Sequence, residues 1–185
     1  MNINVGISNR HVHLTKEVKD ILFGKDYELE VKRELIQTGE FASTSKVTLK
    51  TDKGIIDGVR VIGPIRNYTQ VEILKSDEEV LGLHTSERNS GELENTPGIT
   101  LIGPLGEVHV PSCVIIANRH IHMTEEDALR FNVKNDEIVS VKKDDTIIDN
   151  VHIKIKNNYV LECHLDRDDE IKYNIHTGDK VEIIK

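Results

Sequence analysis

The chain has 185 residues, a hydrophobic fraction of 37% and a formal net charge of −8 at pH 7. This length can bury a core without disulfide crosslinks, in one domain or in two small domains that pack together. The acidic balance argues against general nucleic-acid binding, which selects basic surfaces, although local arginines or metal ions can still hold a small anion.

The first half of the chain is predicted to contain strands and one helix. Residues 5–7 form an expected strand that leads to His11-Val12-His13, and Thr15 is the expected N-cap of a short helix that runs to about residue 23. Residues 47–49 and 55–62 flank a turn at residues 51–54, as in a β-hairpin. Residues 71–74, 99–102 and 108–110 are further expected strands, and residues 84–96 are an expected surface loop.

The second half repeats the beginning of the first. After an expected strand at residues 114–116, the phrase Asn-Arg-His-x-His occurs again, and Thr124 is the expected N-cap of a helix that runs to about residue 131. Strands are expected at residues 138–141, 147–155, 160–165 and 181–184. So many short strands favour β-barrels over a layered α/β sheet, and the repeat indicates two related β units.

Two His-x-His pairs, separated by an offset of 109 residues, give the strongest chemical signal. Alternate residues of a strand point to the same face, so each pair can hold one metal ion from one side. Neutral imidazole is a good ligand for zinc and similar metals. The pairs therefore predict a dinuclear site that includes His11, His13, His120 and His122.

Two more side chains are candidate ligands, each with a structural alternative. Glu72 stands between Val71 and Ile73 and could be a metal ligand or a solvent-facing strand acid. His164 shares a strand face with Glu162 and could be a ligand or a surface histidine.

Arginines next to these candidates have separate interpretations. Arg66 follows the turn Gly63-Pro64-Ile65, where its guanidinium could bind phosphate through two parallel hydrogen bonds or form a surface salt bridge. Arg10 and Arg119 precede the His pairs and are expected in ion pairs at the barrel ends. The remaining histidines that lack a partner at ligand spacing are expected to be structural: His84, His109, His152 and His176.

Several common chemistries and locations have no signal. The chain has no GxSxG, Walker or GxGxxG motif, and Cys113 and Cys163 stand in no nucleophile motif or CxxC pair. No stretch approaches the ~20 apolar residues of a membrane span, and no segment resembles a secretion signal. The sequence therefore predicts a cytoplasmic protein with free thiols, without a membrane or nucleic-acid partner.

Several phrases in the same order resemble those of one family, the PduL-type phosphotransacylases, also called phosphate propanoyltransferases. The resemblance covers nearly the whole chain and rests on GISNRHVHL at residues 6–14, RVIGPIR at 60–66, TQVEI at 69–73, Ser90-Gly91, PGITLIGP at 97–104, NRHIHM at 118–123 and His164-Leu165-Asp166.

The resemblance implies two β-barrels capped by short α-helices, one formed by residues 1–10 with 118–185 and the other by residues 11–117. It also implies a homodimer with two zinc ions per subunit. The implied ligands are His11, His13 and Glu72 at one zinc, and His120, His122 and His164 at the other. Arg66 would contact phosphate.

The implied activity is reversible transfer of a short acyl group, propanoyl or acetyl, between coenzyme A and inorganic phosphate, with acyl-CoA and acyl phosphate as the two acyl carriers. Family members packaged in bacterial microcompartments carry an N-terminal extension ahead of the first barrel strand. Here only residues 1–4 precede the expected strand, so an enzyme of acetate or propanoate metabolism free in the cytoplasm is expected.

Two other functions are compatible with the same residues. A dinuclear metallohydrolase acting on thioesters would use the ligands to generate a metal-bound hydroxide. A non-catalytic zinc-binding protein would use the His pairs for stability alone.

Overall fold

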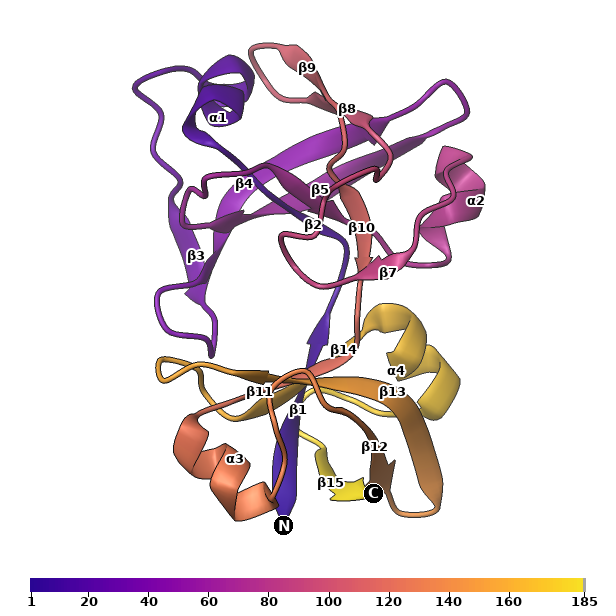
Figure 1. Ribbon diagram of the computed structural model, residues 1–185. Helices are drawn as coiled ribbons and strands as arrows, with labels where there is room; N and C mark the ends of the chain where they lie inside the picture. The colour runs from indigo at the N-terminus through magenta and orange to yellow at the C-terminus, as the bar shows by residue number, and fades with distance from the viewer. Residues whose placement is uncertain (185) are drawn as a thin grey trace. The chain divides into compact units, whose positions relative to one another are not determined.

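The computed structural model describes residues 1–184 and shows a mainly β protein with four short helices in that range (Figure 1). Contacts divide the chain into two compact units. One contains Met1–Asn9 and the described residues from Asn118 onward, and the other contains Arg10–Ala117.

The first unit is a closed six-stranded barrel with the strand order β1-β14-β11-β13-β12-β15. It closes because β1 pairs in parallel with β14 and antiparallel with β15. Its two helices are α3 (Glu125–Phe131) and α4 (Arg167–Tyr173). Its strands are β1 (Asn2–Ser8), β11 (His120–Met123), β12 (Ile138–Lys143), β13 (Thr146–Ile155), β14 (Glu162–Asp166) and β15 (Lys180–Ile184).

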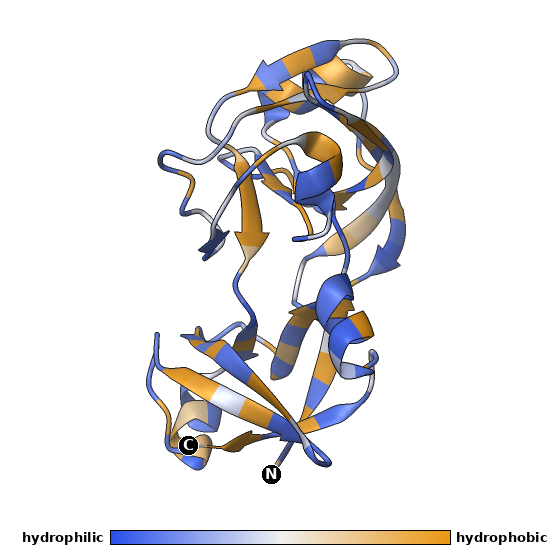
Figure 2. Ribbon diagram, turned by 90° about the vertical axis from the view of Figure 1, so that its right-hand side faces the viewer, coloured by the Kyte–Doolittle hydropathy of each residue, from blue (hydrophilic) through white to orange (hydrophobic). Residues whose placement is uncertain are grey.

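Hydrophobic alternation fixes which side chains face the barrel core. Ile121 and Met123 of β11 and Cys163 and Leu165 of β14 are buried there. Successive strand residues point to opposite faces, so the histidines between them point away from this core. Figure 2 shows the corresponding alternation of hydrophobic and hydrophilic residues along strands of the barrel.

The second unit is a nine-stranded sheet that curls into a half-barrel, with the order β7-β10-β6-β2-β5-β4-β8-β9 and β3 paired to β4. Its helices are α1 (Lys16–Phe23) and α2 (Asp77–Leu81). Its strands are β2 (His11–His13), β3 (Val31–Glu34), β4 (Phe41–Lys50), β5 (Ile55–Gly63), β6 (Gln70–Glu72), β7 (Glu87–Arg88), β8 (Ile99–Ile102), β9 (Glu107–Val110) and β10 (Val114–Ala117). A separate hydrophobic core lies in this unit.

Both helices that follow the His pairs begin at the expected threonines. The Thr15 hydroxyl accepts a hydrogen bond from the Val18 amide at 3.3 Å. Thr124 accepts from the Asp127 amide at 3.1 Å, and the Asp127 carboxylate accepts from the Thr124 amide in return. Such caps satisfy amide groups that the first helical turn leaves without partners. Both predicted helix starts are confirmed, and the helices end at the expected residues.

The predicted fold class is confirmed, with three differences in detail. Helices α2 and α4 and the exposed strand β3 were not predicted. The second unit is a half-barrel, because β7 and β9 end its strand order without pairing to each other among the described residues. The expected loop at residues 84–96 includes the short strand β7, which pairs with β10.

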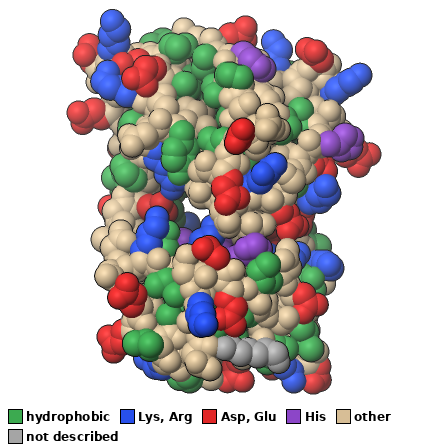
Figure 3. Space-filling view, in the orientation of Figure 1, with side chains coloured by type: hydrophobic (Ala, Val, Ile, Leu, Met, Phe, Trp, Pro, Cys, Tyr) green, Lys and Arg blue, Asp and Glu red, His purple; other side chains and the backbone are tan. Residues whose placement is uncertain are grey.

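On the face shown in Figure 3, acidic and basic side chains are interspersed. Across residues 1–184, every helix is too short to cross a lipid bilayer.

Neither cysteine should react in the folded protein. Cys113 and Cys163 are fully buried, and burial raises the pKa of each thiol to about 12. At about pH 8 the reactive thiolate would be on the order of 10⁻⁴ of each thiol. We expect no labelling of the native chain by a colorimetric disulfide reagent at this pH and two labelled thiols per chain after denaturation. Rapid labelling of the native protein would contradict this expectation.

Candidate metal centre

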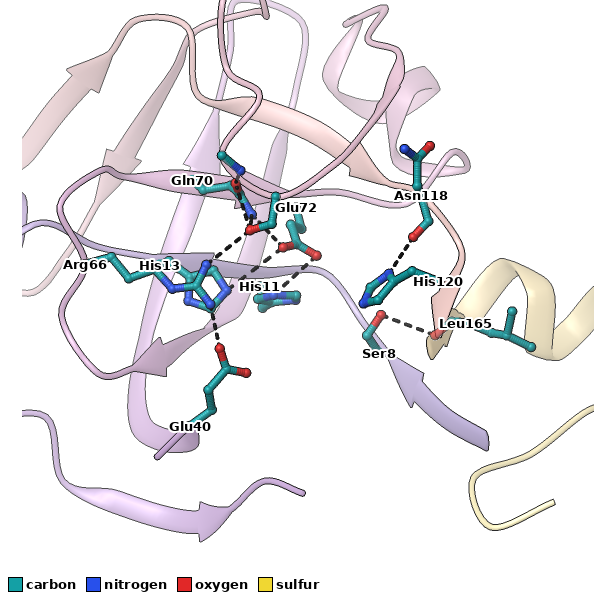
Figure 4. A network of polar contacts seen from close by, with 12 residues as sticks. Ser8, His11, His13, Glu40, Arg66, Gln70, Glu72, Asn118, His120 and Leu165 are labelled. Atoms are coloured by element: carbon teal, nitrogen blue, oxygen red, sulfur yellow. Dashed lines mark hydrogen bonds and ion pairs between the residues drawn. The ribbon is translucent and has the colours of Figure 1, made fainter. Parts of the chain in front are cut away.

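In the half-barrel unit, two antiparallel strands bring one His pair to a carboxylate. β2 pairs with β6 so that His11 lies opposite Glu72 and His13 lies opposite Gln70. The Nε2 atoms of His11 and His13 lie 3.4 and 4.0 Å from the Glu72 carboxylate. Figure 4 shows the three side chains, with these contacts as dashed lines. One ligand atom from each of His11, His13 and Glu72 lies within 4.8 Å of the others, so the three together could hold one metal ion.

In the barrel unit, the same strand arrangement brings three imidazoles together. β11 pairs with β14 so that His120 lies opposite His164 and His122 lies opposite Glu162. The ring centroids of the three histidines are 4.6 to 4.8 Å apart, and their ligand atoms also lie within 4.8 Å of one another. The structure therefore groups the six predicted ligands as two sets of three.

Burial keeps several of these imidazoles neutral, as metal ligands must be. Burial is the largest cause that lowers the pKa of His13 and of His120 well below the usual value. Burial also lowers the pKa of His122 to about 3. These three rings are consequently unprotonated near neutral pH.

The hydrogen bonds of the same rings fit a metal as well. The Nδ1 atoms of His13 and His122 are buried without a hydrogen-bond partner, at matching positions of the two pairs. His120 Nδ1 lies 2.7 Å from the Asn118 carbonyl, which can only accept, so Nδ1 carries the proton and Nε2 keeps its lone pair. An unpaired buried nitrogen is costly unless a ligand satisfies it, so the residues present suit two bound cations.

Arg66 lies beside the first set of ligands. Its charge contributes to the lowered pKa of His13. Its guanidinium donates to Glu40 at 2.7 Å and to the Ser90 hydroxyl at 3.3 Å, and its backbone amide donates to the Leu14 carbonyl. The two interpretations of Arg66 are compatible: it forms a salt bridge in this structure, at a position next to candidate metal ligands.

Buried Gln70 connects Glu72 to the segment that contains Ser90. Gln70 Nε2 donates to Glu72 at 2.7 Å and to the Ser90 hydroxyl at 3.0 Å, and its Oε1 accepts from the Gly91 amide at 2.8 Å. The sequence interpretation assigned no role to Gln70, Glu40 or Glu162. Both Gln70 and Glu162 stand two residues before a candidate ligand, and Gln70 also lies in the phrase TQVEI at residues 69–73.

The arginines that precede the two His pairs form matched ion pairs, as predicted. Arg10 makes two contacts with Asp77 of α2, at 2.7 and 2.8 Å. Arg119 makes two contacts with Asp169 of α4, both at 2.8 Å. Both aspartates are buried, so each pair fixes the entry to a His-x-His strand against a short helix.

The structure does not place the histidines that were expected to be structural in either set of candidate ligands. His109 contacts Thr100 and His176 contacts Glu170. His152 lies beside His120 in the sheet, but it does not belong to the group of three histidines.

Comparison with known proteins identifies the family. Residues 4–176 match the family described as phosphate propanoyltransferase. This chain belongs to the phosphate propanoyltransferase family. A phosphate propanoyltransferase of Thermotoga maritima is 45% identical over 187 residues, covering 99% of this chain and 89% of that protein. A phosphate propanoyltransferase of Citrobacter freundii is 42% identical over 90% of this chain and 81% of its own length, and one of Enterococcus faecalis is 38% identical over 98% and 87%. The name of these relatives denotes an acyltransferase.

The two ion pairs should contribute matched amounts to stability. Replacing Asp77 or Asp169 by asparagine leaves a half-buried arginine without its countercharge, which should lower the free energy of unfolding by about 2–3 kcal/mol. Glu182→Gln, in the exposed pair with the N-terminal amine, is the control and should cost less than about 1 kcal/mol. Urea unfolding followed by circular dichroism measures all three variants. Equal unfolding free energies for the aspartate variants and the control would contradict this role.

Proposed function

We propose that this chain transfers a short acyl group between coenzyme A and inorganic phosphate at a dinuclear zinc site. The observation that carries the proposal is the pair of matched three-residue sets, one of them beside Arg66, in a chain of the phosphate propanoyltransferase family. Acyl-CoA and phosphate are the proposed substrates in one direction, and acyl phosphate and coenzyme A in the other.

The proposed ligands are His11, His13 and Glu72 for one zinc ion and His120, His122 and His164 for the other. Bound zinc would supply Lewis acidity toward developing oxyanions and affinity for a thiolate. These residues suit this role because burial keeps the imidazoles of His13, His120 and His122 neutral, and because the buried Nδ1 atoms of His13 and His122 have no hydrogen-bond partner.

Arg66 is the proposed phosphate-binding residue. A guanidinium offers a planar pair of donors that matches two phosphate oxygens. In the structure Glu40 accepts the contact from Nη2, so an incoming phosphate would replace a carboxylate on the same donor. The exchange of one oxyanion for another keeps Arg66 paired throughout and orients phosphate beside the first ligand set.

We infer direct transfer, in which a phosphate oxygen forms a bond to the thioester carbonyl carbon and the bond from that carbon to sulfur breaks. The proton of hydrogen phosphate balances the thiolate that leaves as coenzyme A. An acyl-enzyme on cysteine is disfavoured because both thiols are fully buried and burial raises the pKa of each to about 12. Holding both reactants in one orientation accounts for a large share of such catalysis.

Other expectations stay predictions. These are the homodimer, the cytoplasmic location without microcompartment packaging, and the approximate bounds of the two β-barrel domains, residues 1–10 with 118–185 and residues 11–117.

The first test measures thiol release from acetyl-, propanoyl- and butanoyl-CoA with and without phosphate. We expect release that requires phosphate, is abolished by a chelator and returns when zinc is added. Release without phosphate would instead show the dinuclear metallohydrolase, which transfers the acyl group to water. No release with any of the three substrates, from a chain that binds zinc, would favour the non-catalytic zinc-binding protein.

The second test concerns Arg66 and its competitor. Arg66→Gln should raise the KM for phosphate ~10–100-fold, the equivalent of one lost charge-assisted hydrogen bond. Glu40→Gln should lower that KM a few-fold, because phosphate no longer displaces a charged partner from Arg66. Arg33→Gln, an exposed arginine on β3, is the control that should leave steady-state kinetics unchanged. An unchanged KM for phosphate in Arg66→Gln would contradict the assignment.

A further inference from the structure

A buried carboxylate lies next to the three imidazoles of the barrel unit. Glu162 stands opposite His122 in the pairing of β14 with β11, so its side chain shares the face of His120, His122 and His164. It is only 4% exposed, and its Oε2 lies 2.9 Å from Nε2 of His164. At this distance the carboxylate can accept a hydrogen bond from the Nε2–H tautomer of His164, which leaves the lone pair on Nδ1.

The neighbouring strand leaves space for this carboxylate. Gly6 of β1 lies opposite His164, and a Cβ at Gly6 would stand 2.6 Å from Glu162 Oε1 and 2.8 Å from its Cδ. Any larger residue at position 6 would therefore push the carboxylate away. At the matching position of the internal repeat, opposite Glu72 in the half-barrel, the chain has Ile115. Of these two matching positions, only the one beside Glu162 is a glycine.

The half-barrel unit contains a counterpart of Glu162. Gln70 stands two residues before Glu72, as Glu162 stands two residues before His164, and each lies opposite the second histidine of its pair. Gln70 holds Glu72 by a hydrogen bond of 2.7 Å, and it too is fully buried. In both units, then, a buried residue contacts the third candidate ligand from the same strand.

The two units differ in where the negative charge lies. The half-barrel set contains a carboxylate, Glu72, with a neutral amide beside it. The barrel set contains only imidazoles, with the carboxylate of Glu162 beside it. Each set therefore combines one carboxylate with its imidazoles, but in the barrel the carboxylate lies beside a ligand candidate, 2.9 Å from His164 Nε2, and is not itself a member of the set.

We propose that Glu162 is the positioning carboxylate of the barrel metal site and that Gly6 keeps it in place. Glu162 accepts the Nε2 proton of His164, fixes the ring so that Nδ1 is the metal-binding nitrogen, and makes that nitrogen more basic. A carboxylate that accepts from a ligating histidine does both. This inference rests on the proposed function in one respect, that His164 is a zinc ligand.

The test is zinc titration of metal-free protein against a competing chromophoric chelator. The wild-type chain should bind two zinc ions. Glu162→Gln keeps the shape of the side chain but removes its charge. It should lower the affinity for one of the two zinc ions ~10–100-fold and leave the affinity for the other unchanged. Gly6→Ala keeps the charge of Glu162 but displaces its carboxylate, so it should lower the affinity for the same zinc ion. The double variant should bind no more weakly than Glu162→Gln, because both changes remove one contact.

Controls separate positioning from folding and from the proposed function. Glu182→Gln, an exposed acid of the same unit, should bind zinc as the wild type does. The metal-free Tm should be the same in Glu162→Gln and the wild type. A lowered metal-free Tm with unchanged zinc affinity would overturn the inference, as would wild-type affinity in Glu162→Gln. A wild-type chain that binds no zinc would overturn the proposed metal centre itself.

Discussion

The candidate metal centre depends on strand register. In each unit an antiparallel partner places a third ligand candidate directly opposite the first histidine of a pair, Glu72 on β6 and His164 on β14. A slip of one residue would turn that side chain to the core face. The register is fixed because Val71 on β6 and Cys163 on β14 are fully buried in the two hydrophobic cores. Burial of these apolar side chains therefore fixes where Glu72 and His164 lie relative to the His pairs.

The internal repeat extends further than the His pairs. An offset of 92 residues relates Gln70, Glu72 and Asp77 to Glu162, His164 and Asp169. The strands that contain the third ligand candidates, β6 and β14, are each followed by a short helix, and in each unit an arginine before the His pair is paired to the aspartate of that helix. The chain also passes from one unit to the other immediately before each His pair, after Asn9 and after Ala117. Strands β1 and β10 consequently belong to a different unit from the His pair that follows each of them.

Local features were predictable from sequence, and long-range contacts were not. Thr15 and Thr124 cap helices through residues three positions away, and the His pairs share a face through strand alternation alone. Helix α4 also had a local signal, since Asp166 is followed by three acidic residues of a first turn. The contact of Arg66 with Glu40 and the space that Gly6 leaves for Glu162 join distant residues, so no spacing rule could find them. For Glu72 and His164 the sequence offered two interpretations, and the strand pairing brings both to the His pairs.

The central claim is that two matched sets of side chains, one in each unit, each hold a transition metal. Anomalous scattering at the zinc absorption edge, from crystals grown with zinc, tests this most directly. We predict one peak among His11, His13 and Glu72 and one among His120, His122 and His164, each about 2.0–2.2 Å from its ligand atoms. Zinc found only elsewhere on the surface, with both sets empty, would contradict the account.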